Sequence, residues 1–203
     1  MLRMLNLGVA HVMIDSYSAW FIEEYAHDVP IIIEALIAAE DRRARNHSGI
    51  DTFSLLRAGA KFTYGHKLAG VSTIEQQLVR TIFPRRGRLL LIAKLEELIL
   101  TIRLHRTRSK LSIWLAYLYC AYYGTDMQNY NSVRDFFAKP KARLNWDQAL
   151  AIVSCLKYPK PSVQSDRWED SHSLRVNYLR ARLPDPNPRL RDLGYQNGSV
   201  EGT

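Results

Sequence analysis

The sequence lacks the features that mark several common protein classes. Its 203 residues include only two cysteines, Cys120 and Cys155, and both lie in apolar segments. This excludes a disulfide framework, and the scattered histidines do not give a four-ligand zinc spacing. No apolar run reaches the roughly 20 residues that span a membrane. The apolar stretch at residues 5–14 is interrupted by His11, so we expect neither a transmembrane helix nor a signal peptide.

Acidic residues are the minority among the charged residues. Lysine and arginine number 28 against 20 aspartates and glutamates, which gives a net charge of +8. Such a chain favours an anionic partner, whether nucleic acid, anionic lipid or a phosphorylated substrate. No recognition-helix motif is present and the basic residues cluster around carboxylates, so we do not expect a nucleic-acid partner.

Strand-like alternation is also scarce, and helical periodicity dominates. The predicted fold class is therefore all-α. Helices are predicted at about residues 30–43, 51–62, 89–105, 109–123, 146–157 and 171–183, with a further helix capped by Ser72 and Glu75 in capping-box spacing. Residues 133–138 form a short aromatic segment. We expect an N-terminal segment of unclear role (1–28), one domain (29–183) and a polar, flexible tail (184–203).

Glu40 is the first residue that could carry chemistry. It continues the apolar stripe of its predicted helix and lies near the helix C-terminus, where the helix dipole disfavours an anion. A carboxylate in this position is costly unless it is paired. Two interpretations stay open: an ion pair with Arg42, Arg43 or Arg45, or a functional carboxylate.

Glu97 is the second candidate. Lys94, Glu97 and Thr101 form the one polar stripe of an otherwise apolar helix. Such a stripe lines a cleft or forms a structural ion pair, here between Lys94 and Glu97.

The segment between the two glutamates has its own polar pattern. Ser72 and Thr73 come at a helix N-terminus, which is either an anion site or an ordinary cap. Gln76 and Gln77 are adjacent and so face different sides of the helix. The basic residues that follow could bind phosphate or form a solvated loop; they are Arg80, Arg85, Arg86, Arg88 and Lys94.

Together these segments resemble the peptidoglycan glycosyltransferases, the family of the glycosyltransferase domains of class A penicillin-binding proteins and of monofunctional transglycosylases. Five motifs occur in the family's order. The first motif comprises residues 35–43 (ALIAAEDRR), 47–51 (HSGID) and 57–58, and the second comprises 70–78 (GVSTIEQQL). The third is 94–97 (KLEE), and the fourth comprises 109–110, Ile113 and 117–118. The fifth comprises 136–140 (FFAKP), Leu144, Ala149 and 159–161. At Glu75 the family usually has Thr or Ser.

The resemblance implies a lysozyme-like helical fold and polymerisation of lipid II. In that reaction the growing glycan donates from C1, the 4-hydroxyl of the acceptor attacks with inversion, and undecaprenyl pyrophosphate leaves. Glu40 matches the general base, and Glu97 matches the glutamate that assists departure, directly or through Mg²⁺ or Mn²⁺. The implied substrate-binding residues are Asp41, Ser72, Gln76, Gln77, Arg80, Arg88 and Lys94.

The resemblance also implies a location and partners. The partners would be lipid II, the growing glycan chain, the membrane surface and other cell-wall synthesis proteins, at the outer face of the cytoplasmic membrane. Two alternatives remain: a catalytically impaired relative that binds lipid-linked or glycan substrate, and a lysozyme-like enzyme that cleaves glycans.

Overall fold

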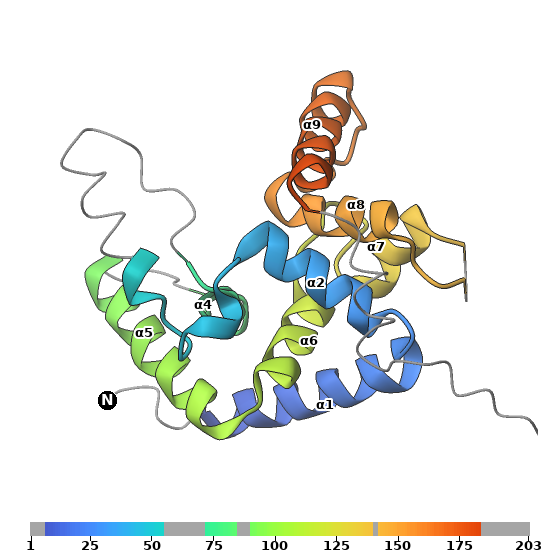
Figure 1. Cartoon of the computed structure of the whole chain (residues 1–203). Coiled ribbons are helices and arrows are strands. Elements are labelled where there is room, and N and C mark those ends of the chain that lie inside the picture. Colours follow the sequence, from blue (N-terminus) through green and yellow to red (C-terminus); the bar gives the residue numbers. More distant parts are fainter. Residues whose placement is uncertain (1–6, 55–71, 85–89, 140–141, 184–203) are drawn as a thin grey trace, which may run out of the picture.

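The computed structural model describes residues 7–54, 72–84, 90–139 and 142–183. These ranges contain helices and, apart from isolated bridges at Gly124, no β-structure, so the predicted all-α class is confirmed (Figure 1). The elements are α1 (Leu7–Tyr25), α2 (Val29–Glu40), a short 3-10 helix η2 (Ala44–Asn46), α4 (Ile74–Ile82), α5 (Leu90–Thr107), α6 (Lys110–Cys120), α7 (Tyr130–Phe137), α8 (Trp146–Lys157) and α9 (Asp166–Arg182). The expected loop at 64–71, most of the expected helix at 51–62, Arg85, Arg86, Arg88 and the expected tail lie outside the described residues.

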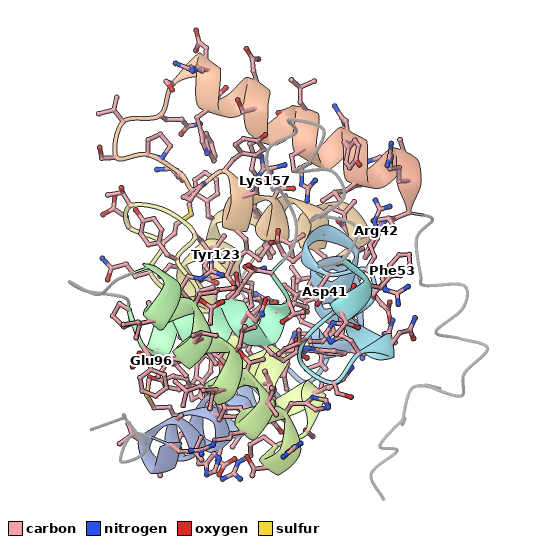
Figure 2. All side chains as sticks on the ribbon, turned by 90° about the vertical axis from the view of Figure 1, so that its left-hand side faces the viewer. Asp41, Arg42, Phe53, Glu96, Tyr123 and Lys157 are labelled. Carbon is pink, nitrogen blue, oxygen red and sulfur yellow. The ribbon has the colours of Figure 1, made fainter. Side chains whose placement is uncertain are left out.

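The core lies between α6 and its neighbours. α1 and α4 pack on α6, while α2 and α9 pack on α8. Figure 1 shows α1 passing beneath α6 at one end of the molecule and α9 lying beyond α8 at the other. In α6 every residue from 113 to 118 is buried. In Figure 2 the side chains fill the space between the helices, and Tyr123, which is fully buried, lies among them.

The N-terminal segment belongs to this core. Ala10, Ile14 and Phe21 of α1 are fully buried. The rings of Phe21 and Tyr25 contact that of Tyr130, with centroid distances of 4.4 and 5.2 Å. Packing therefore continues across residue 29, where the sequence suggested that a domain begins.

A buried ion pair connects α7 to the residue just before α2. Arg134 of α7 donates from Nε to Asp28, just before α2, over 2.7 Å, and both side chains are at most 1% exposed. The second carboxylate oxygen of Asp28 accepts the backbone N–H of Leu144 at 3.1 Å, and Arg134 also donates to the Ala142 carbonyl. Because a buried charge needs a partner, these contacts fix α2 against the segment that leads into α8.

The structure corrects the ends of three predicted helices. α2 ends at Glu40, three residues before Arg43, because Asp41 adopts an extended φ of −151°. α6 ends at Cys120 rather than Tyr123. α9 begins five residues before Ser171, since Ser165 caps it by accepting the N–H of Trp168.

The N-cap of α4 is also shifted by one residue. Thr73, not Ser72, is the cap: its hydroxyl accepts the Gln76 N–H, and the Gln76 side chain accepts the Thr73 N–H. The Thr73 hydroxyl also donates to the Gly49 carbonyl at 2.7 Å. Gly49 has φ +84°, and a Cβ there would lie 3.1 Å from His105. The second motif is thus tied to a turn that favours glycine.

Candidate functional site

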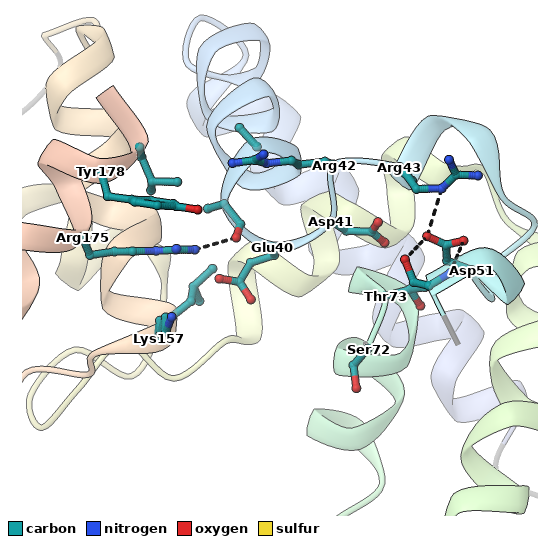
Figure 3. A pocket seen from close by; sticks show the side chains of 15 residues that line it. Glu40, Asp41, Arg42, Arg43, Asp51, Ser72, Thr73, Lys157, Arg175 and Tyr178 are labelled. Carbon is teal, nitrogen blue, oxygen red and sulfur yellow. Dashed lines mark hydrogen bonds and ion pairs between the residues drawn. The ribbon is translucent and has the colours of Figure 1, made fainter. Parts of the chain in front are cut away.

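A cavity of about 720 Å³ opens where α2 ends. Its wall is built from the C-terminal end of α2, the following segment, the residues before α4, the end of α8 and one face of α9 (Figure 3). The polar side chains that line it are Glu40, Asp41, Arg42, Arg43, Asp51, Ser54, Ser72, Thr73, Lys157, Arg175 and Tyr178.

Glu40 points into this cavity from the last turn of α2. Its carboxylate accepts a hydrogen bond from Gln77 Nε2 at 3.2 Å. Of the two interpretations, the ion pair with Arg42, Arg43 or Arg45 does not occur among the described contacts: Arg43 pairs with Asp51 and Arg45 with Glu34. Glu40 is therefore held by a neutral amide rather than by a local arginine.

The surroundings of Glu40 set its proton affinity. Burial raises the pKa of Glu40 above the ordinary glutamate value, while the Gln77 hydrogen bond and the charges of Arg175 and Lys157 lower it in part. Figure 3 shows both cations on the side of the cavity that faces Glu40. The net result is a carboxylate whose pKa lies closer to neutrality, as suits a group that exchanges protons.

The side chain of Gln77 is held in turn by a hydrogen bond from α6. The hydroxyl of Tyr117, on α6, donates to Gln77 Oε1 over 2.6 Å. Tyr117 is 5% exposed, and burial raises its pKa, so it stays protonated and a donor. The amide of Gln77 must then present its NH₂ group to Glu40.

Glu97 lies on α5 in a different environment. It is 4% exposed and accepts from Lys94 Nζ at 2.6 Å and from Arg80 Nε at 3.3 Å. The predicted Lys94–Glu97 pair is thus present. Arg80 also donates to the Ser72 hydroxyl at 2.9 Å, and Ser72 lines the Glu40 cavity. Ser72 therefore connects the Glu97 cluster to the cavity.

The residues around Glu97 do not fit the expected Mg²⁺ or Mn²⁺ ion. Its two oxygens face Lys94 and Arg80, which already balance its charge. Among the described residues, Glu97 is in no group of three carboxylate, histidine or cysteine ligands. We therefore assign no chemical step to a metal ion at Glu97.

The remaining predicted substrate-binding residues differ in whether they reach the cavity. Asp41 lines the cavity but turns its carboxylate to His47, with 2.8 Å between Oδ2 and Nε2. Gln76 is 1% exposed and occupied in capping α4, away from the cavity wall. Arg88 lies outside the described residues.

Sequence reasoning missed the cations that face Glu40. Lys157 ends α8, and Arg175 lies on α9, where its Nη2 donates to the Ala39 carbonyl at 2.7 Å. The separation of 136 positions between Arg175 and Ala39 leaves no local pattern to detect.

Comparison with known proteins identifies the family. The family model described as Transglycosylase matches residues 19–183. The chain belongs to the transglycosylase family. The region that matches the family model thus begins within α1, the helix that packs on α6.

Similar proteins carry consistent names. The chain is 35% identical over 140 residues to a biosynthetic peptidoglycan transglycosylase of Burkholderia vietnamiensis, covering 68% of this chain and 54% of that protein. It is 31% identical to one from Thiobacillus denitrificans, covering 72% and 60%. It is 33% identical to penicillin-binding protein 1A of Aquifex aeolicus, covering 63% of this chain but only 18% of that protein. The chain thus spans three fifths or less of these relatives.

No helix in the part of the chain that the structure describes combines the length and apolarity needed to cross a membrane.

Proposed function

We propose that this transglycosylase-family protein is a peptidoglycan glycosyltransferase that polymerises lipid II. The observation that carries the proposal is the environment of Glu40, a carboxylate with raised pKa at the edge of a cavity lined by Lys157 and Arg175. A carboxylate with these neighbours suits a base that works beside an anionic substrate. The family match supports the same activity.

In the proposed reaction Glu40 removes the proton of the acceptor 4-hydroxyl as its oxygen attacks C1 of the donor. A new C–O bond forms, the bond from C1 to the pyrophosphate oxygen breaks, and the configuration at C1 inverts. Gln77 holds the carboxylate in place through its hydrogen bond to Glu40. Base catalysis of this kind contributes roughly 10²–10⁴-fold.

We assign the leaving pyrophosphate to the cations in the last turn of α4 and on α5. Arg80 and Lys94 are held in position by Glu97, and Ser72 lies between Arg80 and the cavity. Guanidinium groups can pair with two phosphate oxygens at once. Asp41 and Arg88 complete the proposed substrate site, and the proposed place of action is the outer face of the cytoplasmic membrane.

Glycan cleavage is a second candidate, because one observation favours it. Burial raises the pKa of Glu40, as a general acid requires. Lys157 and Arg175 oppose this effect by favouring the ionised form. Polymerisation is therefore the better supported reaction.

The test is glycan formation from labelled lipid II in detergent, with Glu40→Gln as the matched inactive control. We expect glycan chains from the wild type alone. Absence of chains while lipid II still binds would replace the proposal by a substrate-binding role. Release of fragments from purified peptidoglycan, without polymerisation, would instead establish cleavage.

A further inference from the structure

A second group of polar side chains converges beside the Glu40 cavity. Asp41 follows α2, His47 follows η2, and Glu75 lies in the first turn of α4. Each offers one ligand atom, and these atoms all lie within 4.8 Å of one another. Asp41 is 8% exposed and Glu75 1%, and the His47 side chain is 4% exposed.

Glu75 is the unexplained member of this group. Neither of its carboxylate oxygens has a hydrogen-bond partner in the structure, and Nδ1 of His47 also has none. A buried polar group without a partner is costly, and a buried carboxylate more so. The described residues therefore leave this group without the partner that its burial calls for.

Position and charge favour a cation as that partner. Glu75 lies in the first turn of α4, where the helix dipole favours an ionised carboxylate. With Asp41, the cluster then carries two carboxylates and one imidazole. The neighbouring Lys110 donates to the Ala44 carbonyl. Burial raises the pKa of Glu75 and so favours its neutral form in the metal-free protein, whereas a metal ion would bind the ionised carboxylate together with Asp41 and His47.

We propose that Asp41, His47 and Glu75 bind a first-row divalent cation, such as Zn²⁺ or Mn²⁺. Ligand atoms at a bond length of about 2.1 Å are separated by about 3.4 Å at the tetrahedral angle that Zn²⁺ prefers. The 2.8 Å between Asp41 Oδ2 and His47 Nε2 is a hydrogen-bond distance, so the two atoms would need to separate by only about 0.6 Å to bind an ion. Imidazole suits zinc, and carboxylates suit manganese. This site is separate from Glu97 and does not depend on the proposed function.

The site would act on the Glu40 cavity through Asp41. Asp41 is next to Glu40 in sequence and lines the same cavity. A cation on its carboxylate would hold the segment after α2 against the first turn of α4. We therefore expect the ion to stabilise the fold and the position of this wall, not to contact the reacting atoms.

The test measures metal binding directly. The full chain is treated with EDTA, dialysed, and titrated with ZnCl₂ by calorimetry and with MnCl₂ by electron paramagnetic resonance. Glu75→Gln keeps the size of the side chain but removes a charged ligand, and His47→Gln removes the imidazole. Glu169→Gln, at an exposed position on α9, is the matched control.

We expect one ion per chain for the wild type and for Glu169→Gln. Affinity should fall by about 10-fold or more in Glu75→Gln and His47→Gln, since even loss of an outer-shell contact costs about 10–100-fold. The wild-type melting temperature should rise by roughly 5–10 °C at about 100 times the dissociation constant.

Three results would overturn the site. They are no binding of either ion by the wild type, equal affinity in Glu75→Gln, and a higher melting temperature for Glu75→Gln that no cation changes. The last would show that the ionised Glu75 carboxylate destabilises the fold and that no cation compensates for it. None of these readouts depends on lipid II, so failure here is distinguishable from failure of the glycosyltransferase proposal.

Discussion

Glu40 and Glu97 are the same amino acid in two opposite electrostatic settings. Glu40 is at the end of a helix, beside a cavity, and its hydrogen-bond partner is the neutral amide of Gln77. Glu97 is inside α5 and is bound by Lys94 and Arg80. Burial raises the pKa of Glu40, because no cation forms an ion pair with it among the described contacts. The charge of Glu97 is instead balanced by Lys94 and Arg80, and Glu97 holds these two cations in position.

This difference shows how one residue type serves two purposes. A carboxylate that exchanges protons must not be tied to a strong cationic partner, since such a partner lowers its proton affinity. A carboxylate that positions cations needs the reverse. The hydrogen-bond partners of the two glutamates, more than their positions in the sequence, distinguish the proposed base Glu40 from Glu97, which positions cations.

The largest expected effect is on activity at Glu40. Glu40→Gln keeps the shape but removes the proton acceptor, so polymerisation of lipid II should fall by about 10²–10⁴-fold. Initial rates measured by gel separation of labelled glycans test this. Activity within about threefold of the wild type would exclude Glu40 as the general base.

The second prediction concerns stability, where the two glutamates should respond in opposite directions. Glu97→Gln weakens charged hydrogen bonds to Lys94 and Arg80 and should reduce the free energy of unfolding by about 1–3 kcal/mol. Glu40→Gln should increase it at neutral pH, because burial disfavours the ionised wild-type carboxylate.

Urea unfolding at several pH values measures both changes. Since the folded state raises the pKa of Glu40, its contribution to stability is present below the unfolded pKa and is lost as the pH rises through the folded pKa. The advantage of Glu40→Gln over the wild type should therefore grow as the pH rises through that range. An advantage that shrinks with rising pH would contradict this account.

A smaller effect is expected at Tyr117. Tyr117→Phe removes only the hydroxyl that donates to Gln77, so Gln77 is free to rotate its amide. The loss of one hydrogen bond should lower kcat by about 2- to 10-fold with little change in KM. If Tyr117 were only a core residue, kcat would stay at the wild-type value.

The smallest expected effect is a shift in the pH dependence of the polymerisation rate. The Gln77 hydrogen bond lowers the pKa of Glu40, so Gln77→Ala should raise it further. The acidic limb of the pH–rate profile should then move to higher pH than in the wild type. A limb at the same or lower pH would show that Gln77 does not set the proton affinity of Glu40.

Much of the fold could be predicted from local sequence signals. The helix at 146–157 matches α8 at both ends, because Asn145 and Pro159 mark its limits. The Ser109 cap and the Lys94–Glu97 pair were also predictable, since they lie within one or two helical turns. Both cysteines are free, as expected.

Non-local features could not be predicted. Serine is at least as good an N-cap as threonine by type, so only the contact of Thr73 with Gly49 distinguishes Thr73 from Ser72. The Arg43–Asp51 and Arg45–Glu34 pairs that leave Glu40 to Gln77 depend on how the chain turns after α2. The assigned roles of the candidate site residues stay predictions until the experiments above are done.

The position of α9 has a consequence for the order in which the protein is made. Arg175, Tyr178 and Leu179 line the cavity whose other walls come from the end of α2 with the segment after it, the residues before α4 and the end of α8. During synthesis from the N-terminus, Glu40 emerges about 135 residues before Arg175 does, as their positions dictate. Until α9 has left the ribosome, the cavity lacks one wall and Glu40 faces only Lys157 of its two cations. The nascent chain therefore carries its candidate base long before it has a complete substrate site.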